Sequence, residues 1–222
     1  MFQRHVFPKA RGKYIALCEG DDYWTDPLKL QKQVDFLESH PDYSMCFHKA
    51  KVIVQDGREY VDYFSKLEER EYKADEILTR WIVPTVSILF RADVHVPEHK
   101  DFIAGDTVIH TSCAVNGRVY CMQQEMSVYR LHNAGWSANA GTFERQIIKS
   151  IPHRLALLEL FPSSQMRGAK RMTACRCCDW LFNYKRYRGT ISAKYVFKAL
   201  HYCNYDLLYM VLKRFVYKFT RM

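Results

Sequence analysis

The sequence predicts an α/β domain followed by a helical extension, and three observations support this prediction. Short apolar runs of strand length alternate with helical patterns between residues 14 and 140. Beyond residue 142 the apolar residues recur only with the spacing of helices. The charge changes near the same place, because residues 1–150 hold 19 Lys and Arg against 21 Asp and Glu, whereas residues 151–222 hold 14 against 3. We therefore expect two parts, residues 1–141 and residues 142–222.

The composition narrows the class of protein. The 222 residues are 48% hydrophobic and 26% charged, which suits a globular chain with a real core. No uninterrupted apolar run reaches about 18 residues, and the first twenty residues lack the apolar segment of a signal peptide. Eight cysteines in such a chain are expected to be reduced, and the run "CRCC" lacks the second ligand pair of a structural zinc site. These features predict a cytoplasmic protein.

The first elements read as strand, acidic turn and helix. The run "KYIALCE" has the length of a strand, and "TDPLKLQKQVDFLESHPD" has a helical pattern. In that helix Asp26 is a candidate N-cap and Pro27 occupies the first helical position. Its apolar face is expected to hold Leu30, Val34 and Leu37.

The later elements follow from periodicity and turn signals. The segment "YSMCFHKAKVIVQDGREYVDYF" alternates around Asp56 and Gly57, which predicts a hairpin. Next come a strand in "VSILFRAD", a short helix in "GDTVIHTSCAVNG" closed by Asn116 and Gly117, and two short strands or a strand and a loop in "RVYCMQQEMSVYRLH". Three helices complete the chain, in "TFERQIIKSIPHRLALLELF", "MTACRCCDWLFNYKRYR" and "SAKYVFKALHYCNYDLLYMVLKRFVYKF".

Three carboxylates follow the first predicted strand, at Glu19, Asp21 and Asp22. The carboxyl ends of strands in α/β sheets are where ligands bind, and Mg²⁺ or Mn²⁺ prefers oxygen ligands. Such a cation can neutralise the charge of a departing diphosphate. The alternative is an acidic helix N-terminus, in which the carboxylates simply favour the helix dipole. The spacing alone leaves both interpretations open.

The stretch "ARGKYIALCEGDDYWTDPLKLQKQVDFLESHPD" resembles the middle of a family 2 glycosyltransferase. The resemblance implies a GT-A fold, the Rossmann-like architecture of nucleotide-diphospho-sugar transferases. In that family an acidic motif, usually Asp-x-Asp, holds a divalent metal and the sugar nucleotide. Glu19 takes the first acidic place and Asp21 and Asp22 the later ones. Glu for Asp at the first place is a departure, because the carboxylate moves outward by about one methylene.

Two further stretches continue the resemblance in the expected order. "IVPTVSILFRAD" is similar to the segment beside the acceptor sugar, with Thr85 and Ser87 on a strand that ends at Arg91. Gly105 and Asp106 fall where the family places its catalytic aspartate, the general base that takes a proton from the acceptor hydroxyl. Without the resemblance, Asp106 is more typical of a helix N-cap.

The element "YRLHNAGWS" resembles the family's segment that closes the donor site. The resemblance implies that Arg130 and His132 face the diphosphate and the metal. The implied metal ligands are therefore Asp21, Asp22 and His132. A solvated arginine and a half-buried histidine are the alternative interpretation of the pair.

The implied activity is the transfer of a sugar, with inversion, from a nucleotide sugar to a saccharide or lipid-linked acceptor in cell-surface polysaccharide synthesis. The resemblance covers roughly residues 8–140 and leaves the first β-α units of the family, which grip the nucleotide, without a counterpart. We therefore expect a partial GT-A domain. A catalytically silent, truncated fragment of such an enzyme is the alternative.

The basic second part carries aromatic residues interleaved with Lys and Arg, as in "YKRYR" and "LKRFVYKF". Such a pattern is typical of helices that lie on anionic lipid, so residues 151–222 are expected to meet the inner face of a membrane. A helical extension with a solvated basic face is an equal alternative. A nucleic-acid-binding module is less favoured, since no known signature of one is present.

Overall fold

A computed structural model describes residues 5–79, 82–135, 143–183 and 192–219. The chain divides into two compact units, the first formed by Met1–Glu98 and Gly105–Ala140, the second by His99–Ala104 and Gly141–Met222. The predicted α/β class is confirmed. That the two parts are separate domains with a boundary at residue 141 stays a prediction.

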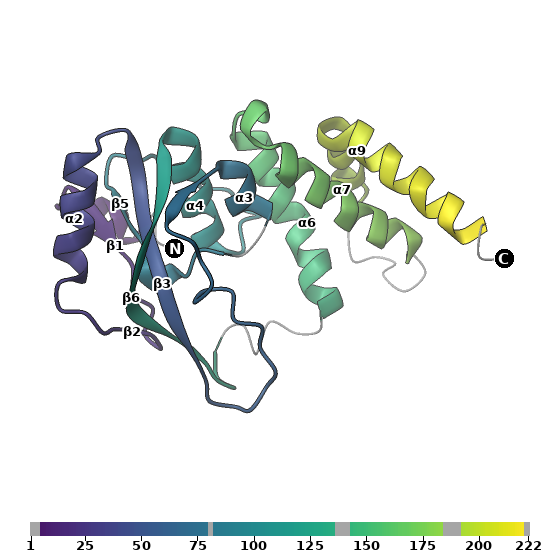
Figure 1. The fold of residues 1–222 in the computed structure, drawn as a ribbon. Helices are drawn as coiled ribbons and strands as arrows, with labels where there is room; N and C mark the ends of the chain where they lie inside the picture. Colours follow the sequence, from purple (N-terminus) through teal and green to yellow (C-terminus); the bar gives the residue numbers. More distant parts are fainter. Residues whose placement is uncertain (1–4, 80–81, 136–142, 184–191, 220–222) are drawn as a thin grey trace. The chain divides into compact units, whose positions relative to one another are not determined.

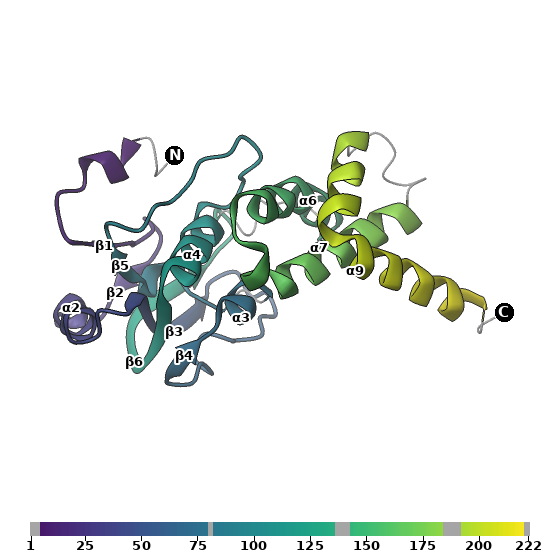
Figure 2. The ribbon, with the colours of Figure 1, turned by 90° about the horizontal axis from the view of Figure 1, so that it is seen from above.

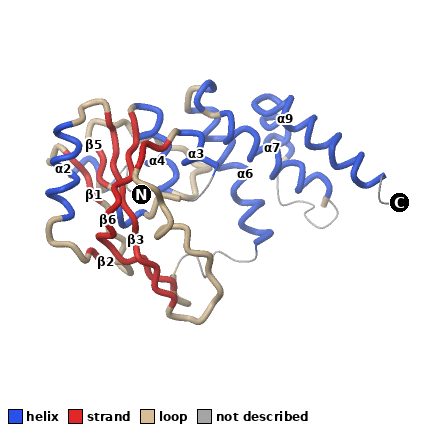
Figure 3. Tube along the Cα trace, in the orientation of Figure 1, coloured by secondary structure: helices blue, strands red, loops and turns tan. Residues whose placement is uncertain are grey.

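The first unit is built on one mixed sheet, with the strand order β1-β5-β3-β6-β2 and with β4 also pairing with β6 (Figures 1 and 3). The long central strands β3 and β6 run parallel, and the other pairs are antiparallel. The strand bounds are β1 Tyr14–Ala16, β2 Tyr23–Trp24, β3 Tyr43–Val54, β4 Arg70–Tyr72, β5 Leu89–Arg91 and β6 Arg118–Leu131.

Helices cover both faces of this sheet. Helix α2 (Lys29–Ser39) packs on one face and α4 (Gly105–Asn116) on the other, as Figures 1 and 2 show from two directions. Helix α3 (Ala74–Thr79) packs against α4, and short 3₁₀ turns lie at η1 (Phe7–Lys9) and η2 (Thr85–Ser87). Buried side chains such as Phe47, Phe90 and Val119 fill the space between these layers.

The strand predictions need two corrections. The hairpin around Gly57 is wrong: the backbone turns there with φ of +72°, but residues 58–63 form no strand, and β3 pairs instead with β5 and β6. The stretch "RVYCMQQEMSVYRL" forms one strand rather than two. Its register against β3 shifts between Met122 and Glu125, which accommodates the polar residues without ending the strand.

The first predicted helix is confirmed as α2, but its inward face is wrong. Leu37 is buried as expected, whereas Leu30 is 40% exposed and the polar residues Lys29 and Gln33 are buried in its place. The helix begins at Lys29, two residues later than expected. Asp26 caps the preceding turn, because its Oδ1 accepts a hydrogen bond from the backbone N–H of Leu28 at 2.8 Å.

The second unit contains the three predicted helices, α6 (Phe143–Leu160), α7 (Arg167–Phe182) and α9 (Ala193–Phe219), with a 3₁₀ turn at η3 (Ser163–Gln165). They pack on one another through small and apolar side chains, including Leu155, Ala174 and Ala199. Helix α9 bends at Cys203, where φ is −126° and ψ is 21°. No helix in the described part of the chain is long and apolar enough to cross a membrane.

Candidate active site

The acidic turn lies between β1 and β2 and is fixed by its own backbone. The N–H of Asp22 donates to the carbonyl of Glu19 at 3.1 Å, which closes the turn. Strand β2 then pairs with β6, with Tyr23 opposite Val128. The turn is therefore held beside the C-terminal end of β6, although the two segments are more than 100 residues apart in the sequence.

The structure brings Arg130 and His132 into direct contact with the predicted acidic motif. The backbone N–H of Arg130 donates to Asp22 Oδ1 at 2.8 Å, and its Nε donates to the carbonyl of Asp21. His132 Nε2 lies 3.1 Å from Asp21 Oδ2. A carboxylate that accepts a backbone N–H and lies beside a guanidinium is oriented by charge-assisted bonds. These four residues thus form one cluster.

The carboxylates of this cluster disfavour one another's charge. Asp22 is 8% exposed, and burial raises its pKa to about 6, even though the N–H of Arg130 opposes the rise. Glu19 is an exposed residue, but neighbouring protein atoms shield its carboxylate from water, which raises its pKa to about 7. The charges of Asp22, Asp106 and Asp21 raise the pKa further. Perturbed carboxylates of this kind are typical of functional sites.

Asp106 belongs to the same acidic environment, because its charge contributes to the raised pKa of Glu19. It lies in the first turn of α4, one residue after the helix begins at Gly105. Its Oδ1 accepts a hydrogen bond from the adjacent N–H of Thr107 at 2.7 Å. Asp106 is thus inside the helix rather than at the N-cap position. Two segments thus supply the acidic residues: the turn after β1 carries three carboxylates, and α4 adds a fourth whose charge reaches Glu19.

The predicted acceptor-side residues do not lie on a strand as expected. Thr85 and Ser87 form the 3₁₀ turn η2, and the strand that ends at Arg91 begins only at Leu89. Pro84 starts this turn, and both the N–H and the hydroxyl of Ser87 donate to its carbonyl. Both Thr85 and Ser87 are buried. Their role toward an acceptor stays a prediction.

Three side chains for which the sequence predicted no role connect β2 and α2 to η2. Trp24 Nε1 donates to the carbonyl of Val86 at 3.0 Å, and Gln33 Nε2 donates to the carbonyl of Ser87 at 2.9 Å. Lys29 Nζ donates to Gln33 Oε1 at 2.7 Å and lies 4.4 Å from the centre of the Trp24 ring. Because an ammonium only donates, it fixes the orientation of the Gln33 amide. We call Trp24, Lys29 and Gln33 the clamp.

The described residues contain no group of three His, Cys, Asp or Glu side chains placed to hold a metal ion by themselves. One buried oxygen, Asp22 Oδ2, nevertheless has no hydrogen-bond partner. Mg²⁺ commonly binds through one or two carboxylates together with substrate phosphates, rather than in an all-protein cage. The residues therefore fit a divalent cation that shares its ligands with a bound diphosphate.

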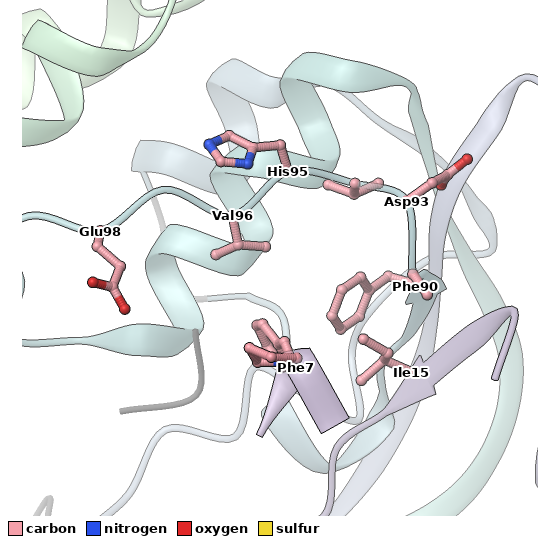
Figure 4. A pocket seen from close by; sticks show the side chains of 10 residues that line it. Phe7, Ile15, Phe90, Asp93, His95, Val96 and Glu98 are labelled. Atoms are coloured by element: carbon pink, nitrogen blue, oxygen red, sulfur yellow. The ribbon is translucent and has the colours of Figure 1, made fainter. Parts of the chain in front are cut away.

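A cavity of about 450 Å³ lies elsewhere in the first unit, and Figure 4 shows its lining. Apolar side chains of Phe7, Ile15 and Phe90 form one part of the lining, and Asp93 and His95 lie on another. None of the predicted site residues lines it. We therefore place the candidate site at the carboxylate cluster, on chemistry rather than on cavity size.

The sequence comparisons find relatives that are uncharacterized. No family model matches the chain. The uncharacterized protein Rv1520 of Mycobacterium tuberculosis and its counterpart Mb1547 of Mycobacterium bovis are each 38% identical over 157 residues, which is 69% of this chain and 44% of theirs. The chain thus spans less than half the length of these curated relatives.

Two solved structures of the glycosyltransferase TarS from S. aureus (residues 1–349) are similar in fold. The complex with UDP-GlcNAc has a TM-score of 0.53 at 14% identity. The match covers 92% of this chain and 59% of the TarS chain. The complex with UDP has a TM-score of 0.50 at 10% identity, covering 92% and 66%. The chain therefore has a glycosyltransferase-like fold.

Proposed function

We propose that this protein is a glycosyltransferase that moves a sugar from a nucleotide-diphospho-sugar to a saccharide or lipid-linked acceptor, with inversion. One observation carries the proposal: Arg130 and His132 contact Asp21 and Asp22 of the acidic turn, in a fold similar to that of a protein solved with UDP-GlcNAc. The charge of Asp106 reaches the same turn through Glu19. A catalytically silent fragment is the alternative.

The acidic turn is the proposed donor side. Mg²⁺ or Mn²⁺ would be held by the donor diphosphate together with Asp21, Asp22 and His132, since these three residues are not placed to hold it by themselves. The partnerless Asp22 Oδ2 would be the buried ligand. When bound, the cation supplies positive charge to a departing diphosphate. The guanidinium of Arg130 lies at the same turn and can pair with a phosphate oxygen. Glu19, as the outer carboxylate, completes the donor side.

Asp106 is the proposed general base, on the side of the attacking acceptor hydroxyl. An acceptor hydroxyl must lose its proton as its oxygen attacks the anomeric carbon, and a carboxylate on the attacking side accepts that proton. The acceptor oxygen displaces the diphosphate directly, and the diphosphate departs toward the acidic turn. Because the transfer takes one step, no covalent intermediate with the protein is needed. Thr85 and Ser87 are proposed to shape the acceptor side through the backbone of η2, because their side chains are buried.

Donor binding tests the first half of the proposal. The chain is titrated with UDP and with UDP-GlcNAc by calorimetry, with and without Mn²⁺. We expect Mn²⁺ to raise the affinity for UDP, and the double substitution Asp21→Ala with Asp22→Ala to remove the gain. Asp35→Asn, on the exposed side of α2, is the matched control and should leave the gain intact. Equal affinity with and without the two carboxylates would sink the donor-side assignment.

Turnover tests the second half. In UDP release from UDP-GlcNAc, Asp106→Asn should lower turnover by at least about 10²-fold and leave UDP affinity unchanged, because a general base acts mainly in the transition state. A purely structural role, in which Asp106 only accepts the N–H of Thr107, predicts near-normal turnover with Asn, whose side-chain oxygen also accepts. It predicts a loss of about 1 kcal/mol of stability with Ala. Donor binding without any turnover, in wild type and variant alike, would favour the silent fragment.

A further inference from the structure

Helix α9 has apolar residues on two opposite faces after its bend at Cys203. One face packs into the second unit, where Cys203 is 1% and Leu207 2% exposed. The other face is open: its apolar side chains are spaced at i, i+3, i+4 and i+7, the repeat of a single helix face, and are 55% to 84% exposed, namely Tyr205, Leu208, Tyr209 and Leu212. A helix that is apolar all round normally has both faces covered.

Two more exposed apolar side chains lie on the part of α9 that precedes the bend. Phe197 is 71% and Leu200 48% exposed. Isolated apolar side chains on a surface need no explanation, but six exposed on one helix, four of them at the spacing of a single face, indicate a binding surface. We call Phe197, Leu200, Tyr205, Leu208, Tyr209 and Leu212 the outer face of α9.

The charge around the outer face indicates the kind of partner. Residues 151–222 carry 14 Lys and Arg against 3 Asp and Glu. On α9 itself, Lys194 and Lys213 are exposed and Asp206 is half-buried. Lys198 is paired with Glu159, and Arg214 with Asp179. Two copies of so basic a segment would repel each other in a symmetric contact. An anionic surface that also accepts apolar side chains satisfies the charge and the outer face together.

We propose that the outer face of α9 binds the surface of an anionic lipid bilayer. Leucine and phenylalanine side chains enter the boundary between headgroups and acyl chains, and the tyrosine hydroxyls stay among the headgroups. Lys194 and Lys213 lie near the lipid phosphates. This contact goes beyond the proposed transferase function and does not depend on it. Its consequence, nearness to a lipid-linked acceptor, does rest on the proposed function.

The test measures binding of the full chain to vesicles of phosphatidylcholine alone and of phosphatidylcholine mixed with phosphatidylglycerol, by co-sedimentation. We expect binding to rise with the phosphatidylglycerol fraction and to fall as salt is added, since charge contacts are screened within about 8–10 Å. Leu208→Ser and Leu212→Ser should each weaken binding by about tenfold, because a leucine loses most of its transfer free energy. Lys213→Gln should weaken it by about fivefold on the mixed vesicles only.

Leu28→Ser is the matched control, because Leu28 is 57% exposed in the first unit and Leu212 is 55% exposed on the outer face. It should bind like wild type. Circular dichroism melting should show all four variants folded, since the positions are exposed. Three results would overturn the proposal: no binding above the phosphatidylcholine level, a dimer that Leu212→Ser abolishes, or tight binding of single-stranded nucleic acid that Leu212→Ser abolishes while vesicles stay unbound. Because vesicles contain no nucleotide sugar, failure here leaves the transferase proposal untouched.

Discussion

The buried lysine of the clamp gives the sharpest prediction about the first unit. Lys29 is 1% exposed, and burial lowers the pKa of its ammonium from 10.5 to about 8. Its partners are one amide oxygen of Gln33 and the face of the Trp24 ring, with no carboxylate among the causes of the shift. The charged form is therefore poorly compensated, and stability should depend on pH through this group. The substitution that removes it is Lys29→Met, which keeps the length of the side chain.

Proton linkage gives the direction in which the free energy of unfolding changes with pH. The unfolded chain keeps the proton on Lys29 up to about pH 10.5, whereas the folded chain releases it above about pH 8. Between these values the unfolded state binds more protons, so the free energy of unfolding rises with pH. Its total contribution over that window is about 3 kcal/mol, at 1.36 kcal/mol per pKa unit. From pH 7 to pH 9 we expect a gain of about 1 to 1.5 kcal/mol.

In the folded state, the ionisable neighbours of Lys29 have pKa values outside the range from pH 7 to pH 9. Burial raises the pKa of Cys46 to about 12, and burial lowers the pKa of His48 to about 3. Cys18, which also faces the ammonium, has its pKa raised above its usual value of 9.0. Asp26, which interacts with His48, has its pKa lowered by Lys32. Lys29 is thus the group of this cluster expected to change charge between pH 7 and pH 9.

The assay is urea unfolding of wild type and Lys29→Met at pH 7 and at pH 9. The difference in unfolding free energy between the two proteins should shift by about 1 to 1.5 kcal/mol in favour of wild type at the higher pH. Lys32→Met is the control: it removes a partly exposed lysine of the same helix and should show no such shift. A difference that stays constant within about half a kcal/mol would refute the view that Lys29 is buried and charged.

Two further predictions concern backbone contacts in the same unit. Gln33→Met removes the amide donor and leaves the buried carbonyl of Ser87 without this partner, so we expect a loss of about 1–3 kcal/mol in urea unfolding. Gln31→Met, on the exposed side of α2, should change little. Gly117→Ala should lower the free energy of unfolding by about 1–3 kcal/mol, because the added Cβ would lie 2.8 Å from Ser44 Cβ. Gly20→Ala is the comparison, since no atom lies within 4 Å of the Cβ it would add. Equal stability of the two variants would contradict the packing argument.

The sequence predicted helices better than strand partners. The short helix of residues 105–116 and the three helices of the second unit followed from local periodicity. The hairpin prediction failed because the turn signal at Asp56 and Gly57 is local, whereas the partners of β3 come from residues 89–91 and 118–131. A turn signal determines the backbone conformation at the turn, but it does not determine which strand the following segment pairs with.

The burial of Lys29 and Gln33 could not be predicted for the same reason. Hydrophobic periodicity placed Leu30 inward, but Gln33 finds its acceptor at Ser87, 54 residues away. Only the resemblance placed Arg130 and His132 with the acidic turn. The pairing of β2 with β6, through which the structure brings them together, joins segments of two and fourteen residues that no local pattern connects.

The energetic arrangement of the acidic cluster also argues for a ligand. The pKa values of Glu19 and Asp22 are raised in the folded state, so the stability that these groups contribute is present at low pH and is lost as pH rises through about 6 to 7. At neutral pH the native turn therefore holds charge that the unfolded chain would hold more easily. The backbone N–H and the positive charge of Arg130 offset part of this cost for Asp22, whose Oδ2 stays without a partner. A site selected for stability alone would replace one of these carboxylates by an amide. Retaining all of them, with Asp106 alongside, is explained most simply by a bound partner that brings positive charge into the turn.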